Sequence, residues 1–193
     1  MKKYFFTLLV LCLALQVNAQ KKIKYDVDLT YFYGLSINSD FGNFGRSDYK
    51  MNALGLRASV RYQFSEAISA GLGLGLDGYH NPDYNTFPVF ITAQYAPLSD
   101  NRNAFLFADL GRGFGDTTHF NHGTTLNLGA GYKLMTGKNF GLTFRLGYNV
   151  RWADGKSKSE ILNETKEGDV LFVRFDELKH TRHSIITSIG ITF

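Results

Sequence analysis

The sequence predicts an all-β fold, an eight-stranded antiparallel up-and-down transmembrane β-barrel. Four observations lead to this prediction. Apolar and polar residues alternate with a period of two along most of the 193 residues, and the connections between the alternating stretches are short and long in turn. Beyond residue 20 the sequence contains no run of about 18 apolar residues, which excludes a helical membrane protein. The 20 Gly, 17 Phe and 11 Tyr fit strands with close backbone contacts and aromatic surfaces.

Residues 1–19 have the layout of a secretory signal peptide. Two lysines precede an apolar run over residues 4–15, and a Val-Asn-Ala cleavage site ends at Ala19. The run is shorter than the roughly 20 residues of a spanning helix, so we expect cleavage rather than anchoring. Cys12 lacks the small preceding residue of a lipoprotein signal and is expected to leave with the leader. Residues 20–193 then form the barrel domain without a disulfide.

The alternating stretches define the strands. In the first, the odd positions from Tyr25 to Ile37 are aromatic or aliphatic, whereas the even positions begin with Asp26 and Asp28. Successive side chains of a strand point to opposite faces, so each stretch has one apolar and one polar face. The expected strands are 25–37, 54–64, 68–77, 87–95, 105–114, 126–134, 140–152 and 185–193.

Two of these strands need further argument. Pro88 removes one backbone donor and is acceptable in 87–95 because we expect it near a strand end. The stretch 105–114 is ambiguous, since Phe105 and Phe107 compete with Leu106 for the apolar face. We place Asp109 of this strand on the polar face.

The connections alternate in length. Those around residues 65–66, 97–103 and 135–138 are short, whereas 38–50, 117–123 and 154–181 are long. Tight turns at one end and long loops at the other are typical of an up-and-down meander. Within 154–181, residues 169–175 read as an extra hairpin arm that offers a strand edge to a partner.

Alternation alone does not show which face meets water, because a soluble lipocalin-type barrel or sandwich buries its apolar face. All five Glu lie in turns or loops, whereas the polar face carries four acids and five bases that nearly cancel. Aromatic residues gather at both strand ends, as membrane barrels place them at the lipid interfaces. We therefore predict an interior polar cluster of Asp26, Asp28, Arg57, Arg61, Asp77, Asp109, Lys133, Arg145 and Arg151.

These features, together with the terminal strand 184–193, resemble the small outer-membrane β-barrel family of Gram-negative bacteria, of the OmpX and OmpA-membrane-domain type. The resemblance covers residues 23–193. It implies location in the bacterial outer membrane, contact with outer-membrane lipid and lipopolysaccharide, and recognition by the barrel insertion machinery during biogenesis. In that family an apolar last strand with a final aromatic residue is the insertion signal, a role that the resemblance implies for Ile189, Ile191 and Phe193.

Three basic residues are predicted to contact lipopolysaccharide. Lys179 and Arg182 lie at the outer end of the last strand, and Arg151 lies across from them on the neighbouring strand. Guanidinium forks match phosphate oxygens, although a solvated rim explains the same pattern.

Signals for catalysis or metal binding are weak. His119 and His122 stand three residues apart without a nearby cysteine or carboxylate pair, which favours a solvated loop over a metal site. His183 and Ser184 are adjacent in a strand and face opposite sides, so they cannot act as base and nucleophile. We expect no enzymatic activity, no cofactor and no metal.

The sequence therefore predicts an outer-membrane barrel with a side-chain-filled interior and extracellular loops for surface interaction or structural roles. Loop 154–181 is the expected contact with an extracellular protein or surface ligand, and a monomer is expected. One alternative is a narrow pore for ions or small solutes, lined by Arg57, Arg61, Arg145 and Asp77. The other is a lipid A-modifying barrel enzyme. The nearly balanced charge gives no reason to expect nucleic-acid binding.

Overall fold

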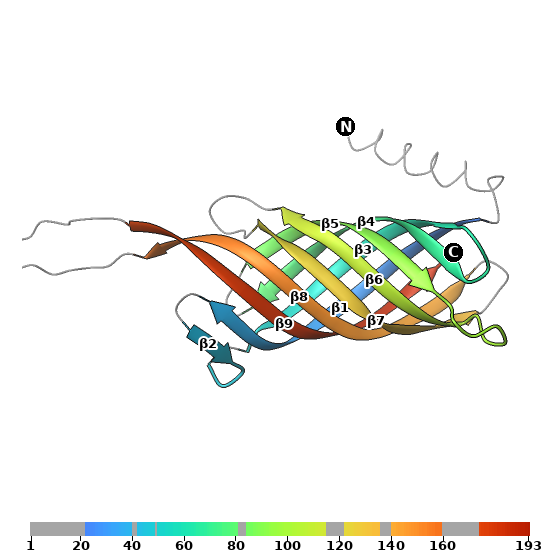
Figure 1. Cartoon of the computed structure of the whole chain (residues 1–193), viewed down its shortest axis with the longest axis horizontal. Helices are drawn as coiled ribbons and strands as arrows, with labels where there is room; N and C mark the ends of the chain where they lie inside the picture. Colours follow the sequence, from blue (N-terminus) through green and yellow to red (C-terminus); the bar gives the residue numbers. More distant parts are fainter. Residues whose placement is uncertain are drawn as a thin grey trace, which may run out of the picture.

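The computed structural model describes residues 22–39, 42–48, 50–80, 84–114, 122–135, 140–159 and 174–193. These residues form a closed antiparallel barrel of eight strands with one short accessory strand at its rim (Figure 1). The predicted signal peptide lies outside the described residues. Within them, no helix is long and apolar enough to cross a bilayer.

Each barrel strand pairs antiparallel with the next, and the last pairs back with the first. At this seam the N–H of Phe193 donates to the carbonyl of Tyr25 at 2.9 Å, and Tyr25 donates back at 2.8 Å. A closed sheet has no free edge within the wall, and the predicted fold class is confirmed. The strands are β1 (Ile23–Ser39), β3 (Asn52–Gln63), β4 (Ile68–His80), β5 (Tyr84–Tyr95), β6 (Ala104–Phe114), β7 (His122–Met135), β8 (Gly141–Ser159) and β9 (Arg174–Thr192).

The two faces of the wall differ in chemistry. In β3, Leu54 and Leu56 are about half exposed on the outside, whereas Arg57 and Arg61 are buried inside. The same alternation continues around the barrel: leucines, isoleucines and aromatic rings cover the outer surface, and charged and amide side chains fill the interior. The predicted sidedness is therefore confirmed, and the soluble alternatives, which bury the apolar face, are wrong.

The ambiguous strand β6 turns its phenylalanines inward. Phe105 and Phe107 are buried on the same face as Asp109, while Leu106 and Leu110 are exposed outside. The interior accepts these rings because glycines face them across the ladder. In register, Phe105 pairs with Gly131, Phe107 with Gly129 and, in β5, Phe90 with Gly73. A Cβ on any of these glycines would overlap the facing ring.

Glycines also stand opposite the interior charges. In each case a glycine is the register partner of the charged residue on a neighbouring strand, which leaves the space that a long or branched side chain needs. The pairs are Asp28 with Gly190, Arg57 with Gly75, Arg61 with Gly71, Asp77 with Gly55 and Arg145 with Gly131.

The rim departs from the expected loops. Residues 38–50 were expected to form one loop, yet β1 continues to Ser39 and pairs with the accessory strand β2 (Gly42–Gly45). A register irregularity between Gly34 and Ser36 shifts the alternation, so that Ile37 turns inward and is buried, contrary to its predicted outward position. A bulge of this kind adds one residue to one strand and changes the face of those that follow.

The largest correction concerns the predicted loop 154–181. β8 extends to Ser159 and β9 begins at Arg174, so much of this segment is paired strand that projects past the rest of the barrel (Figure 1). Of the predicted hairpin arm, residues 169–173 lie outside the described residues. Phe175 pairs with Lys158 of β8 instead of folding back on a separate arm. A strand pair of matching length satisfies both backbones, which a free loop of this length would leave to solvent.

Pro88 also differs from its predicted place near a strand end. It is the fifth residue of β5 and points inward. The ladder between β4 and β5 runs to Leu74 and Val89 and resumes at Asp77 and Thr86. The missing N–H of proline accounts for this gap in the pairing.

Candidate functional site

The barrel interior brings together charged side chains from six strands, and a tight ion pair lies near the short-turn end. Arg61 of β3 donates from Nε to Asp26 Oδ2 at 2.6 Å and from Nη2 to Asp26 Oδ1 at 2.9 Å. Its third nitrogen, Nη1, donates to Ser69 Oγ at 2.6 Å, and the hydroxyl of Ser59 donates to Asp26 at 3.3 Å. Both charged side chains are fully buried. The paired fork satisfies the charges where water is excluded.

A second ion pair joins β3 to β4. Arg57 Nη2 lies 2.8 Å from Asp77 Oδ2, and Nε donates to Oδ1 at 3.3 Å. The guanidinium carbon of Arg57 stands 5.1 Å from the centre of the Phe32 ring and 5.4 Å from that of Phe90. The aromatic faces attract the cation and fill the space around it.

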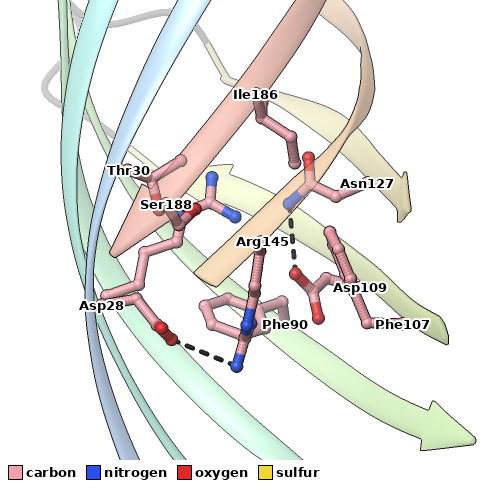
Figure 2. Close-up of a pocket in the computed structure, with 10 residues that line it drawn as sticks. Asp28, Thr30, Phe90, Phe107, Asp109, Asn127, Arg145, Ile186 and Ser188 are labelled. Carbon is pink, nitrogen blue, oxygen red and sulfur yellow. Dashed lines mark hydrogen bonds and ion pairs between the residues drawn. The ribbon is translucent and has the colours of Figure 1, made fainter. Parts of the chain in front are cut away.

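The third ion pair, at the centre of the barrel, has a looser geometry. Arg145 Nη2 lies 3.2 Å from Asp28 Oδ2, and the hydroxyl of Thr143 donates to Asp28 Oδ1 at 3.3 Å. Beside it, Asp109 accepts a 3.3 Å hydrogen bond from the amide nitrogen of Asn127 (Figure 2). Amide and hydroxyl groups therefore complete the polar interior between the charged residues.

The structure places eight of the nine predicted cluster residues in the buried interior. Lys133 differs, because it lies near the end of β7 and is half-buried, with Nζ 4.8 Å from the centre of the Phe105 ring. The buried members are Asp26, Asp28, Arg57, Arg61, Asp77, Asp109, Arg145 and Arg151.

Two of the three predicted lipopolysaccharide contacts are wrong. Arg151 and Arg182 are fully buried, and they are register partners on β8 and β9. Arg151 Nη1 donates to Tyr79 OH at 3.3 Å and to Thr86 Oγ1 at 3.1 Å, and both guanidinium groups lie against the Tyr79 ring at 5.0 and 4.6 Å. Each of these two arginines occupies a strand position whose side chain points into the lumen, so neither can reach phosphates outside the barrel. Lys179 alone of the three is exposed.

Sequence reasoning assigned Arg182 to the rim and did not identify the interior role of Tyr79 or of the buried aromatic rings. The signal for Arg182 was present, because it has the same strand parity as the inward-facing Ser184. For Phe105 and Phe107 the signal was their parity with Asp109. The glycines opposite the rings supply the physical reason for their inward position.

The connection between β2 and β3 packs against the barrel at its long-loop end. Met51 has a left-handed backbone, with φ of 53°, and its side chain is fully buried. Its carbonyl accepts a hydrogen bond from Arg182, and a Cβ at Gly34 would overlap it. Arg46 holds the same connection from outside, donating to Gly34 O at 2.9 Å and stacking 3.7 Å from the Tyr33 ring. A left-handed methionine is strained, so these contacts fix its position.

Residues with metal-binding or nucleophilic chemistry are not brought together in the described part of the chain. No group of three His, Cys, Asp or Glu residues there could hold a metal ion. His183 faces outward and shares a 2.9 Å hydrogen bond between Nδ1 and Tyr148 OH, whereas Ser184 is buried inside. This places the two on opposite faces, as predicted. His119 lies outside the described residues.

The Arg61–Asp26 pair gives a direct test of the interior. Arg61→Met leaves the Asp26 carboxylate buried without its guanidinium partner, so we expect the free energy of unfolding to fall by about 3–5 kcal/mol. Asp26→Leu combined with Arg61→Met removes both charges and is expected to recover most of that loss. Urea titration of protein refolded into phospholipid vesicles measures all three variants. Equal destabilisation by the single and double variants would contradict the pairing.

The chain is similar to several solved structures. One is Neisserial surface protein A (NspA), with 13% identity, a TM-score of 0.49, and coverage of 88% of this chain and 95% of that chain. Another is the outer membrane protein OprG from Pseudomonas aeruginosa, with 12% identity, a TM-score of 0.46, and coverage of 89% and 94%. The outer membrane protein AlkL, determined in DMPC bilayers, has 14% identity, a TM-score of 0.45, and coverage of 89% and 90%. No family model and no curated protein matches the chain.

Proposed function

We propose that the chain is a bacterial outer-membrane barrel protein that carries out a surface-interaction or structural role and has no catalytic activity. One observation carries this proposal: large apolar side chains cover the outside of a closed barrel, while ion pairs fill its inside. A protein of this kind exposes to other molecules only its rims, loops and lipid-facing wall.

The outer surface supports the membrane placement. Leu72, Leu74 and Leu146 are 65%, 63% and 60% exposed, and each of the other barrel strands also exposes large apolar side chains. Exposure of apolar surface to water costs about 25 cal/mol per Å², and soluble monomers rarely expose apolar patches larger than a few hundred Å². A closed barrel also pairs its backbone groups internally, as the hydrocarbon of a bilayer requires.

The last strand fits the proposed insertion signal. Ile189 is exposed on the outside, and the half-exposed Ile191 and Phe193 follow it on the same face, with the Phe193 ring stacked 5.7 Å from that of Tyr25. In our proposal the insertion machinery reads this apolar edge before β9 pairs with β1. Outer-membrane lipid then contacts the same residues in the finished barrel. At the opposite rim, Lys179 remains the proposed lipopolysaccharide contact.

The interior favours a closed barrel over a pore. Arg61 with Asp26, Arg57 with Asp77 and Arg145 with Asp28 occupy successive parts of the lumen, and their side chains are less than a tenth exposed. Passage of a hydrated ion would require these pairs to separate in a region that excludes water, at a cost of several kcal/mol per pair. We therefore propose that solutes do not pass.

The projecting part of β8 and β9 is the proposed contact surface. β7 pairs with β8 only as far as Asp154, and β1 pairs with β9 only as far as His180. In the part of the chain that the structure describes, residues 155–159 and 174–179 continue beyond these points as a two-stranded ribbon, and neither β7 nor β1 pairs with its edges. Exposed strand edges bind extended segments of other proteins by backbone pairing. The proposed partner is an extracellular protein.

Planar-bilayer recording distinguishes the closed barrel from the pore. We expect the purified wild-type protein to insert without producing steady ion currents, because the ion pairs block the lumen. Steady currents that change in Arg57→Gln, but not in Lys50→Gln at the exposed rim, would reject the closed barrel and favour transport.

Shortening the ribbon tests whether the barrel folds and inserts without the proposed contact surface. Lys156 and Glu177 are register partners, so replacing residues 156–177 with an Asn-Gly turn keeps the remaining pairing in register. We expect the variant to insert in the outer membrane and to retain heat-modifiable gel migration, because the pairs with β7 and β1 are untouched.

Crosslinking on intact cells supplies the binding readout. A photo-crosslinking residue at Lys158 is expected to give a discrete adduct with a surface protein, whereas the same residue at Leu98, on the short-turn side, gives none. Absence of an adduct at Lys158, or equal adducts at both positions, would argue against the ribbon as the contact surface.

A further inference from the structure

A small cavity lies at the centre of the barrel, between the looser ion pair and the neighbouring carboxylate. Its volume is about 10 Å³, and its lining includes Asp28, Asp109, Asn127 and Arg145. Figure 2 shows the Arg145 side chain between the carboxylates of Asp28 and Asp109. Charged groups from β1, β3, β6 and β8 therefore line the cavity, together with the amide of Asn127 on β7.

Two of these charged groups have unused hydrogen-bonding capacity. Asp109 Oδ2 accepts from Asn127, but the buried Oδ1 has no hydrogen-bond partner among the described residues. Arg145 Nη2 is close to Asp28 without an aligned hydrogen bond, and its Nε also lacks a partner. In contrast, Arg57 makes two aligned hydrogen bonds to Asp77. A buried polar atom without a partner costs about 1–3 kcal/mol.

The chemistry of the lining determines what can satisfy both groups. The described residues contain no ion pair between Asp109 and Arg145, so a species that bridges the two side chains would satisfy both. It must accept a hydrogen bond from a guanidinium N–H and donate one to a carboxylate oxygen. A metal cation cannot accept, and a halide cannot donate. Water does both, and a cavity of about 10–15 Å³ holds about one water.

We propose that the centre of the barrel is a binding site for a single structural water molecule. The water donates to Asp109 Oδ1 and accepts from the guanidinium of Arg145. It links the Asp109–Asn127 hydrogen bond to the Arg145–Asp28 ion pair, so that a polar network crosses the lumen. This site depends on the fold and the interior geometry, and it holds whether or not the surface role proposed above is correct.

NMR of the full barrel in lipid nanodiscs tests the proposal. The Arg145 Nε–H resonance, assigned by its loss in Arg145→Lys, is expected to show a nuclear Overhauser cross-peak to water with the sign of a long-lived bound molecule. Asp109→Leu removes the acceptor and is expected to abolish this cross-peak. Ser69→Ala, which alters the Arg61 pair away from the cavity, is expected to retain it.

A crystal structure provides the second readout. Solvent density within about 3.2 Å of both Asp109 Oδ1 and Arg145 supports the site. The proposal is overturned if wild-type Arg145 shows no water cross-peak, if the density places Asp109 directly on Arg145, or if Asp109→Leu keeps the cross-peak. Should Asp109→Leu fail to refold, the two wild-type measurements still decide the question.

Discussion

Closing an eight-stranded sheet on itself leaves a lumen that side chains must fill. In this chain the outward positions of the wall are apolar, so the inward positions hold the charges. Charges held away from water are stable only when they are paired and hydrogen-bonded. The double hydrogen bonds of Arg61 to Asp26 and of Arg57 to Asp77 follow from this constraint. The hydroxyl and amide side chains between these ion pairs follow from the same constraint.

Packing in the lumen depends on matching a large residue to a glycine on the next strand. Arg57 faces Gly75, Arg61 faces Gly71, and Phe107 faces Gly129. A side chain on these glycines would meet the backbone or the partner's side chain. Guanidinium groups then lie against aromatic rings, as Arg145 does against Phe107 at 5.4 Å. The interior is therefore a mixed array of cations, carboxylates and rings, with few aliphatic side chains.

The strands, their order and the face that most strand residues occupy were predictable, because alternation is a local property of the sequence. The partner of each charge was not. Asp28 meets Arg145 and Thr143 only because closure brings β1 and β8 to the same lumen. Local rules also miss the irregularity after Gly34, which turns Ile37 inward. Arg182 is buried because it lies within β9. The pairing with β8 extends β9 back to Arg174, well before the predicted start of the strand.

A label scan along β3 tests most directly whether the apolar face of the barrel wall contacts lipid. Cys12 is the only cysteine, so in a Cys12→Ser background single cysteines can carry nitroxide labels at Leu56, Ala58, Ser59 and Val60 in lipid vesicles. We predict that labels at Leu56, Ala58 and Val60 collide with oxygen dissolved in the bilayer, whereas the label at Ser59 is protected from oxygen. If the labels at Leu56, Ala58 and Val60 instead collide with a water-soluble nickel chelate, the apolar face does not contact lipid.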